Sequence, residues 1–396
     1  MKPKYTILSI TLILLLLALL SACNADASAG LFRQISESRA PIGIVYKQLL
    51  GTNTTNDTLF YETDKGLFSS TGAVREQLKS GVEGNLIQYS FYDSTNNYLL
   101  FTTNDGTRTV KILDVATKTM VTPSLDLTTH SAANLRYSRI YASGFTLLQD
   151  TNGVFMLLKY DDDATAKDYV NSTHTLPADT SNYDKVSVHH LTGFENKAVS
   201  EYTPIIISLV RNDGSPDHYR HFYYDATKNP VELPSSTFQK IRIAGFTVSN
   251  STLYILSENG KLFGGVAGGS FTEMIDVSDN YQEGSFIYSV NGTTTTHVVT
   301  KPTAKNSMQV FSFANGSTST SVSTANIKSG YAEFLDTADI VSALYLGSGA
   351  SSDTLLVATN DNGLYKISIN YASANSDSTA NGTSTKSEEY DFIPVP

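Results

Sequence analysis

Cysteine and tryptophan are the residues that this sequence most clearly lacks. Cys23 is the only cysteine among 396 residues, and tryptophan is absent. A single cysteine excludes a disulfide within the chain and any zinc site built on paired cysteines. Without tryptophan, a platform for stacking sugars has to rely on the 23 tyrosines, so carbohydrate binding loses support.

Positive charge is also scarce. Lys and Arg number 28 against 38 Asp and Glu, and the formal net charge is −10. Nucleic-acid binding needs clustered Lys and Arg to neutralise phosphates, and peripheral binding to anionic lipid needs a basic face. We therefore expect no nucleic-acid partner and no attachment to a membrane through basic side chains.

The first residues follow the pattern of a secretory signal peptide. Lys2 and Lys4 supply the positive region, and an apolar run extends from Thr6 to Leu20. This run is shorter than the roughly 20 residues that cross a bilayer as a helix. An uncleaved N-terminal anchor helix is the alternative.

The residues after the apolar run, Leu20-Ser21-Ala22-Cys23, resemble the lipobox of bacterial lipoproteins. The resemblance implies that residues 1–22 are a signal peptide, that cleavage occurs before Cys23, and that fatty acids such as palmitate are attached to Cys23. Two or more acyl chains anchor a protein stably to a membrane. Asn24, where Asp would imply retention at the inner membrane, favours the outer membrane or the cell surface. The expected location is therefore the cell envelope, with a lipid anchor.

The body of the chain is predicted to be all-β. Tyrosine, phenylalanine, threonine and serine are abundant, and aromatic and β-branched side chains fit a pleated sheet. The stretch from Ala73 to Leu78 is the one candidate helix.

One pattern recurs along the chain: an apolar strand, a polar turn closed by glycine, and a second apolar strand. Asn-Gly and Asp-Gly turns between such runs are typical of tight β-hairpins. The pattern is clearest at 58–68, 252–263 and 354–367, and it is weaker at 98–112, 145–157 and 205–224. The turn glycines of these six copies are Gly66, Gly106, Gly153, Gly214, Gly260 and Gly363.

The spacing of these glycines predicts the architecture. Successive intervals are 40, 47, 61, 46 and 103 residues, so a degenerate seventh copy is expected near 297–311. A period of this length with about four strands is typical of a β-propeller. Further strands are expected at 85–92, 186–191, 241–248, 284–290 and 340–347. We predict about seven four-stranded blades; eight blades or tandem β-sandwiches are the alternatives.

The whole chain is expected to divide into four parts: a signal peptide over 1–22, a lipidated tether over 23–40, the propeller over 41–371, and a disordered tail over 372–396. The tail is rich in Ser, Asn, Thr and Asp. A strand over Ile42 to Tyr46 is expected to close the ring by pairing in the last blade, near Leu355 and Tyr365.

No known propeller family matches the repeat, although an aromatic residue after the turn glycine resembles sensor-type and sialidase-type propellers. The absence of tryptophan excludes Trp-Asp repeats, Trp-docking motifs and the sialidase Asp-box. The acidic run Asp161-Asp162-Asp163 lacks the spacing of a calcium loop, and His218 and His221 would face opposite ways on a strand. The glycine-rich run 264–269 lacks the lysine of a P-loop. We therefore expect no catalytic residue, no metal ion and no cofactor.

The sequence favours a non-enzymatic function. A rigid propeller that carries variable loops is suited to binding or scaffolding, with a protein or polysaccharide of the envelope as the partner. The alternative is a hydrolase or lyase that acts on polysaccharide at the mouth of the central channel. Carboxylates, histidines and arginines gathered at one mouth would favour the enzyme.

The lipobox generates the first testable prediction. Cys23→Ser removes the only thiol that can be acylated, so the variant should be released from membranes or accumulate as the uncleaved precursor. Labelling with a palmitate analogue, followed by fractionation, measures both effects. Labelling that persists in the variant would contradict the assignment of Cys23.

Overall fold

The computed structural model describes residues 45–52, 58–71, 74–80, 85–93, 98–104, 108–121, 124–125, 135–140, 145–150, 155–160, 168–171, 185–191, 204–211, 218–225, 229–291, 295–303, 308–326, 340–348, 352–359, 363–370 and 390–394. The chain divides into two compact units, Met1–Ile44 and Val45–Pro396. The first unit, which includes the predicted signal peptide and Cys23, lies outside the described residues.

The described residues form seven sheets, whose strands are hydrogen-bonded in chain order. Sheet 1 contains β1 (Tyr46–Thr52), β2 (Thr58–Thr63), β3 (Gly66–Thr71) and β4 (Val74–Ser80). Sheet 2 contains β5 (Asn85–Asp93), β6 (Tyr98–Asn104), β7 (Arg108–Asp114) and β8 (Thr119–Val121). Sheet 3 contains β10 (Leu135–Ile140), β11 (Phe145–Asp150), β12 (Phe155–Tyr160) and β13 (Asp168–Asn171), with β9 (Ser124–Leu125) added in parallel to β13.

The remaining sheets follow the same plan. Sheet 4 contains β14 (Lys185–His190), β15 (Ile205–Arg211), β16 (His218–Tyr224) and β17 (Pro230–Glu232), followed by a short helix, α3 (Ser235–Phe238). Sheet 5 contains β18 (Ile243–Ser249), β19 (Thr252–Ser257), β20 (Lys261–Gly265) and β21 (Phe271–Asp276). Sheet 6 contains β22 (Ile287–Asn291), β23 (Thr295–Thr300), β24 (Gln309–Ala314) and β25 (Ser323–Asn326), and sheet 7 contains β26 (Ile340–Ser348), β27 (Ser352–Thr359), β28 (Gly363–Asn370) and β29 (Tyr390–Pro394).

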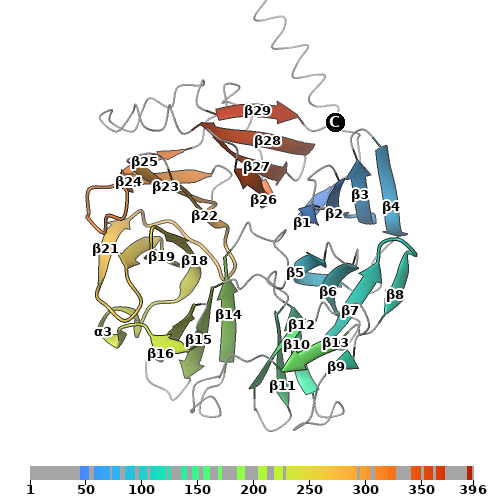
Figure 1. The fold of residues 1–396 in the computed structure, drawn as a ribbon, viewed down its shortest axis with the longest axis horizontal. Coiled ribbons are helices and arrows are strands. Elements are labelled where there is room, and N and C mark those ends of the chain that lie inside the picture. Colours follow the sequence, from blue (N-terminus) through green and yellow to red (C-terminus); the bar gives the residue numbers. More distant parts are fainter. Residues whose placement is uncertain are drawn as a thin grey trace, which may run out of the picture. The chain divides into compact units, whose positions relative to one another are not determined.

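The sheets of the second unit stand around a common centre. The first strands contact one another from sheet to sheet: β1 contacts β5 and β26, and β18 contacts β14 and β22. Figure 1 shows these first strands on the inner side, with the later strands of each sheet farther out. Antiparallel sheets repeated around a centre define a β-propeller. The predicted all-β propeller fold is therefore confirmed, and the alternative of tandem sandwiches is wrong.

The hairpin pattern locates the two middle strands of every sheet. The copies at 58–68, 252–263 and 354–367 are the β2–β3, β19–β20 and β27–β28 hairpins, and the degenerate copy is β23–β24. The separately predicted strands at 85–92, 186–191, 241–248, 284–290 and 340–347 correspond to first strands. Turn chemistry and strand periodicity are local signals, which is why the sequence predicted these hairpins.

Both ends of the propeller differ from the expectation. Of the strand predicted over Ile42 to Tyr46, only Val45 and Tyr46 are described. They bond Asp64 and Thr63 in sheet 1 rather than sheet 7, so the predicted closure of the last blade is wrong for this part. The fourth strand of sheet 7 is β29, which pairs with β28, so the predicted propeller boundary at 371 and the wholly disordered tail over 372–396 are wrong for Tyr390–Pro394. The first and last sheets instead meet through β1 and β26, where the Leu49 amide donates to Ser342 Oγ at 3.1 Å.

The stretch expected to be helical is a strand. Val74–Ser80 is β4, the outer strand of sheet 1, and it pairs with β3 from Gly66↔Ser80 to Thr71↔Val74. Hydrogen bonding to a neighbouring strand outweighs the weak helix propensity of so short a segment.

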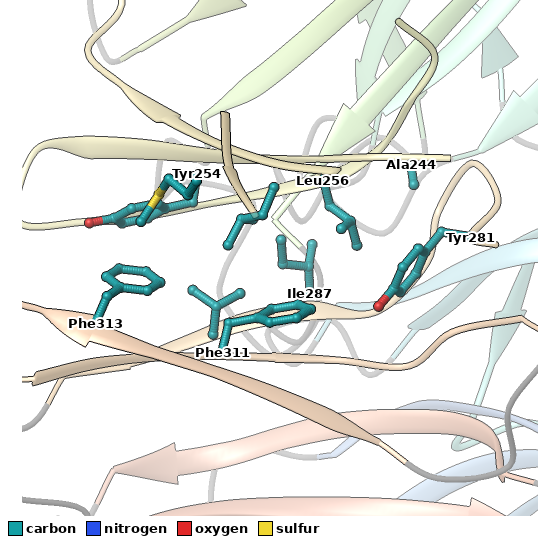
Figure 2. Packing of buried hydrophobic residues seen from close by; sticks show 10 residues of the cluster. Ala244, Tyr254, Leu256, Tyr281, Ile287, Phe311 and Phe313 are labelled. Carbon is teal, nitrogen blue, oxygen red and sulfur yellow. The ribbon is translucent and has the colours of Figure 1, made fainter. Parts of the chain in front are cut away.

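The hydrophobic core consists of layers between neighbouring sheets. Figure 2 shows one of them: Tyr254 and Leu256 of sheet 5 face Phe311 and Phe313 of sheet 6. The rings of Tyr254 and Phe313 lie 4.9 Å apart. A second cluster joins sheets 4 and 5 around Phe238 of α3, and a third joins sheets 1 and 2. In these three described layers, the apolar face of one sheet is therefore buried against the next sheet.

Gly260, in the β19–β20 turn, shows how closely the connections approach one another. Its φ is +84°, and a Cβ there would lie 2.6 Å from the carbonyl oxygen and 2.7 Å from the nitrogen of Asp279. Any side chain at this position would therefore be strained in its own backbone and would collide with the backbone of the next linker. Of the other turn glycines, Gly66 has a φ of +127° and Gly363 opens β28, whereas Gly106, Gly153 and Gly214 lie outside the described residues.

We predict that Gly260→Val lowers the free energy of unfolding by more than about 2 kcal/mol, because one strained backbone position alone costs about 1 to 3 kcal/mol. Lys261→Val is the matched control. The Lys261 side chain makes surface ion pairs with Glu273 and Asp276, so its replacement should cost no more than about 0.5 kcal/mol. Denaturant unfolding measures both variants, and equal losses would show that the turn is not the constrained element.

Candidate functional site

The strand order places two kinds of connection at one end of the sheets. Each first strand starts at the end where the turn between the second and third strands lies, and the fourth strand returns there to reach the next sheet. The described connections at this end of sheets 4 to 6 are residues 233–242, residues 277–286, the turn at Glu258 to Gly260 and residues 301–303 after β23. We call this end the linker face; functional residues of rigid scaffolds are typically carried on such connections.

Backbone hydrogen bonds hold the 277–286 linker to both sheets that it joins. Val277 and Tyr281 donate their amides to the carbonyls of Gly260 and Glu258, which belong to the turn of sheet 5. Toward sheet 6, the amide of Thr303 donates to Asn280 O at 2.8 Å. The linker is therefore fixed along its length, although it is neither helix nor strand.

Tyr281 anchors this linker in the core. Its hydroxyl donates to Gln309 Oε1 at 2.9 Å and lies 3.0 Å from Thr300 Oγ1, which must then be the donor. Gln309 Nε2 in turn donates to Asp279 Oδ2 at 2.6 Å. Burial raises the pKa of Tyr281, so the phenol stays protonated and keeps its donor hydrogen. A directed chain of hydrogen bonds thus runs from sheet 6 back to the carboxylate of the linker.

Glu283 connects the same linker to sheet 4. Ser187 Oγ on β14 donates to Glu283 Oε2 at 3.1 Å, and the amide of Gly284 donates to Ala244 O on β18. Gly245 permits this approach, because a Cβ there would lie 3.0 Å from Ser285 O of the linker and 2.8 Å from Ile287 Cγ2 at the start of β22. One linker therefore contacts the first strands of sheets 4 and 5 and leads into the first strand of sheet 6.

Sheet 4 contains a buried chain of two histidines and a serine. Ser208 Oγ lies 2.9 Å from His189 Nε2 and 2.7 Å from His221 Nδ1. His221 Nε2 lies 3.0 Å from Ile241 O, which can only accept, so Nε2 carries the hydrogen. Burial, followed by the neighbouring His189, lowers the pKa of His221 to about 3, so the ring is neutral and Nδ1 accepts from Ser208. Ser208 has one hydrogen, so His189 must donate to it through Nε2.

A second buried histidine lies in sheet 6. His297 Nδ1 is 2.7 Å from Ser312 Oγ on the neighbouring strand, and burial lowers the pKa of His297 to about 4. Within the described residues its Nε2 has no hydrogen-bond partner. His297 is 5 % exposed, so it is a neutral member of a sheet interface.

Sheet 1 contributes a buried carboxylate. Glu62 on β2 is 5 % exposed, and it accepts hydrogen bonds from Gln48 Nε2 at 3.1 Å and Lys47 Nζ at 3.5 Å. Burial raises the pKa of Glu62, although Lys47 opposes the shift. Both donors lie on β1, so this carboxylate ties the first two strands together.

These contacts show what the polar groups do chemically. Ser208 and His221 have the spacing of a nucleophile and its base, but both are buried, and His221 bonds a backbone carbonyl instead of an orienting carboxylate. Among the described residues no cluster of three or more histidines, cysteines or acidic residues could hold a metal ion. The buried polar side chains therefore act as connections between strands and sheets.

Cys23 and the acidic run Asp161–Asp163 lie outside the described residues, so their assignments stay predictions. His218 and His221 both lie in strand β16, as the sequence indicated. The glycine-rich run 264–269 spans the β20–β21 hairpin, not a strand-to-helix turn. No helix in the described part of the chain has the length and apolar character needed to cross a membrane.

The polar chains of Tyr281 and Ser208 were not predicted. A sequence signal existed only for Ser208 and His221, which stand at equivalent distances from the turn of one hairpin, and even there it could not indicate that His189 completes the chain.

Comparisons with known proteins find solved structures of similar fold but no family. No family model matches the chain, and no curated protein matches it. Solved structures with similar folds include PorZ, a surface component of the type-IX secretion system of Porphyromonas gingivalis (13 % identity, TM-score 0.44), which the chain matches over 82 % of its own length and 37 % of the PorZ chain. They also include the BP39L lectin of Burkholderia pseudomallei (12 % identity, TM-score 0.44), where the match covers 83 % of this chain and 96 % of the lectin chain. A third is YCF48 bound to D1 peptide (8 % identity, TM-score 0.44), where the match covers 81 % of this chain and 92 % of the YCF48 chain. The chain spans little more than a third of PorZ, and at these identities the likeness concerns the fold alone.

We predict that Tyr281→Phe lowers the free energy of unfolding by about 1 to 3 kcal/mol, because it leaves buried Thr300 and Gln309 without their shared partner. Thr272→Ser, at an exposed position of β21, is the control and should change stability by no more than about 0.5 kcal/mol. Chemical denaturation measures the difference. An unchanged stability in Tyr281→Phe would mean that the hydroxyl does not anchor the linker.

Proposed function

We propose that this chain is a lipid-anchored binding or scaffolding module of the bacterial envelope, whose seven sheets are the blades of one closed propeller. In this proposal acyl chains on Cys23 hold the module to the outer membrane or cell surface, and residues before the propeller act as a tether. The linker face of sheets 4 to 6 binds a protein partner.

The observation that carries the proposal is the rigid attachment of the linkers. Asn280 and Gln282 are exposed, yet they lie on a segment whose backbone is bonded to the sheets on both sides. Lys240 and Arg242 are exposed on the preceding linker. Polar side chains held in place before binding lose less conformational entropy when a partner docks. A preorganised polar surface is suited to recognising the hydrogen-bonding groups of a protein.

The buried polar groups support the same conclusion. Glu283 and Tyr281 fix the position of the linker, so the face is built into the propeller core. A partner that bound there would contact a surface of fixed geometry on a scaffold held at the membrane.

The test is affinity capture from envelope extract with the mature domain, in which Cys23 is replaced by serine. Two double variants carry the same added charge at opposite ends of the sheets. Asn280→Lys/Gln282→Lys lies on the linker face, and Ser270→Lys/Thr320→Lys lies at exposed positions of the turns at the other end.

We expect the first double variant to lose capture of the partner at least tenfold, whereas the second retains it. Loss in both variants, or in neither, would contradict binding at the linker face. Specific capture of a polysaccharide instead of a protein would overturn the assignment of the partner.

A further inference from the structure

The linker between sheets 4 and 5 is held by the buried histidine chain. Ile241 O accepts from His221 Nε2, Gln239 O accepts from the amide of Tyr219, and Arg242 Nε donates to the hydroxyl of Tyr219. Phe238 of α3 packs edge-on against the His221 ring, with the centroids 6.2 Å apart. Each of these hydrogen bonds involves His221 or Tyr219, which lies two residues before it on the same face of β16.

We propose that the His189–Ser208–His221 chain is a pH-sensitive latch, which holds the 233–242 linker against sheet 4 at neutral pH and releases it when the histidines are protonated.

The chemistry of the latch follows from the single hydrogen of Ser208. At neutral pH the hydroxyl accepts a hydrogen bond from His189 and donates its own hydrogen to His221, so both bonds have a donor and an acceptor. A first proton can be accommodated if the hydroxyl rotates and His189 changes tautomer. When both imidazoles are protonated, both must donate to Ser208, whose own hydrogen then has no acceptor in the chain. Two cationic rings would also share one buried oxygen.

The surroundings favour a neutral ring at His221. Tyr219 stacks on His221 with the centroids 5.8 Å apart, and the guanidinium of Arg242 lies over the Tyr219 ring. The Glu283 carboxylate bonds Ser187, two residues before His189 on β14, and Asp225 lies beyond the far end of β16. Among the described charged groups, Arg242 thus lies on the His221 side of the chain and Glu283 on the His189 side.

The direction of the pH effect follows from the lowered pKa of His221. Its pKa is about 3 in the folded protein and near 6.5 when the ring is exposed to water, so the open state binds more protons between these values. The stability of the closed latch is therefore fully present above pH 6.5 and is lost as the pH falls below it. Between pH 7 and pH 5 the open population should rise about 25-fold from the exposure of His221 alone.

Hydrogen–deuterium exchange of the Cys23→Ser domain tests the latch. After correction for the intrinsic exchange rate, peptides from 233–242 should lose protection at least about 25-fold between pH 7 and pH 5. Peptides from β24 in sheet 6 should stay protected at both values. Equal protection of the linker at the two pH values, or simultaneous loss in β24, would overturn the proposal.

The matched variants separate the latch from general acid sensitivity. His189→Gln/His221→Gln removes both titrating rings and should abolish the pH dependence of linker exchange, whereas His297→Gln, at another buried histidine, should leave it intact. If the double variant does not fold, Ser208→Ala takes its place, and its linker should already exchange rapidly at pH 7. A pH dependence that survives in the double variant, or full protection at pH 7 in Ser208→Ala, would contradict the latch.

Discussion

The packing of each sheet against the next is the constraint on which the rest of this structure depends. A four-stranded sheet has two faces. In the described core layers the apolar side chains are covered by the neighbouring sheet, as around Phe311 in sheet 6, and by the connecting helix α3, whose Phe238 packs beside sheet 5. Such a sheet cannot bury its apolar surface alone. The first strands come close enough for a hydrogen bond between Thr247 Oγ1 and Ser289 Oγ at 2.9 Å, and for the contact between β1 and β26 that joins the ends of the propeller.

Polar side chains within these layers form chains of hydrogen bonds, in which each donor has an acceptor. Tyr281 connects the linker of sheets 5 and 6 to Gln309 and Asp279, and Ser208 connects two histidines to the carbonyl of Ile241. A buried polar group without a partner lowers the stability by about 1 to 3 kcal/mol. The hydrogen bonds of these chains therefore favour one linker conformation, the one that fits the packing of the sheets. The proposed binding face and the proposed latch both follow from this coupling between linkers and core.

The sequence predicted what is local and missed what is not. Turn glycines such as Gly66 and Gly260 and the apolar runs beside them predicted the middle hairpins, because turn type and strand periodicity are properties of neighbouring residues. It did not predict β29, because its pairing with β28 spans the polar segment 371–389 and leaves no periodic signal. The predicted closing strand over Ile42 to Tyr46 rested on an expected long-range pairing with the last blade, whereas Tyr46 pairs with Thr63 of the neighbouring strand β2. The partners of Tyr281 and His221 come from separate strands and linkers, so no motif could indicate them.

The most direct test of the account is whether the propeller unfolds as one unit. Far-ultraviolet circular dichroism reports the strands, and near-ultraviolet circular dichroism reports the tyrosines, which have no tryptophan signal over them. If every sheet depends on its neighbours, the two signals of the Cys23→Ser domain should change at the same denaturant concentration in a single transition. Separate transitions, or strand signal that persists after the tyrosine signal is lost, would contradict the claim that packing between sheets holds the propeller together.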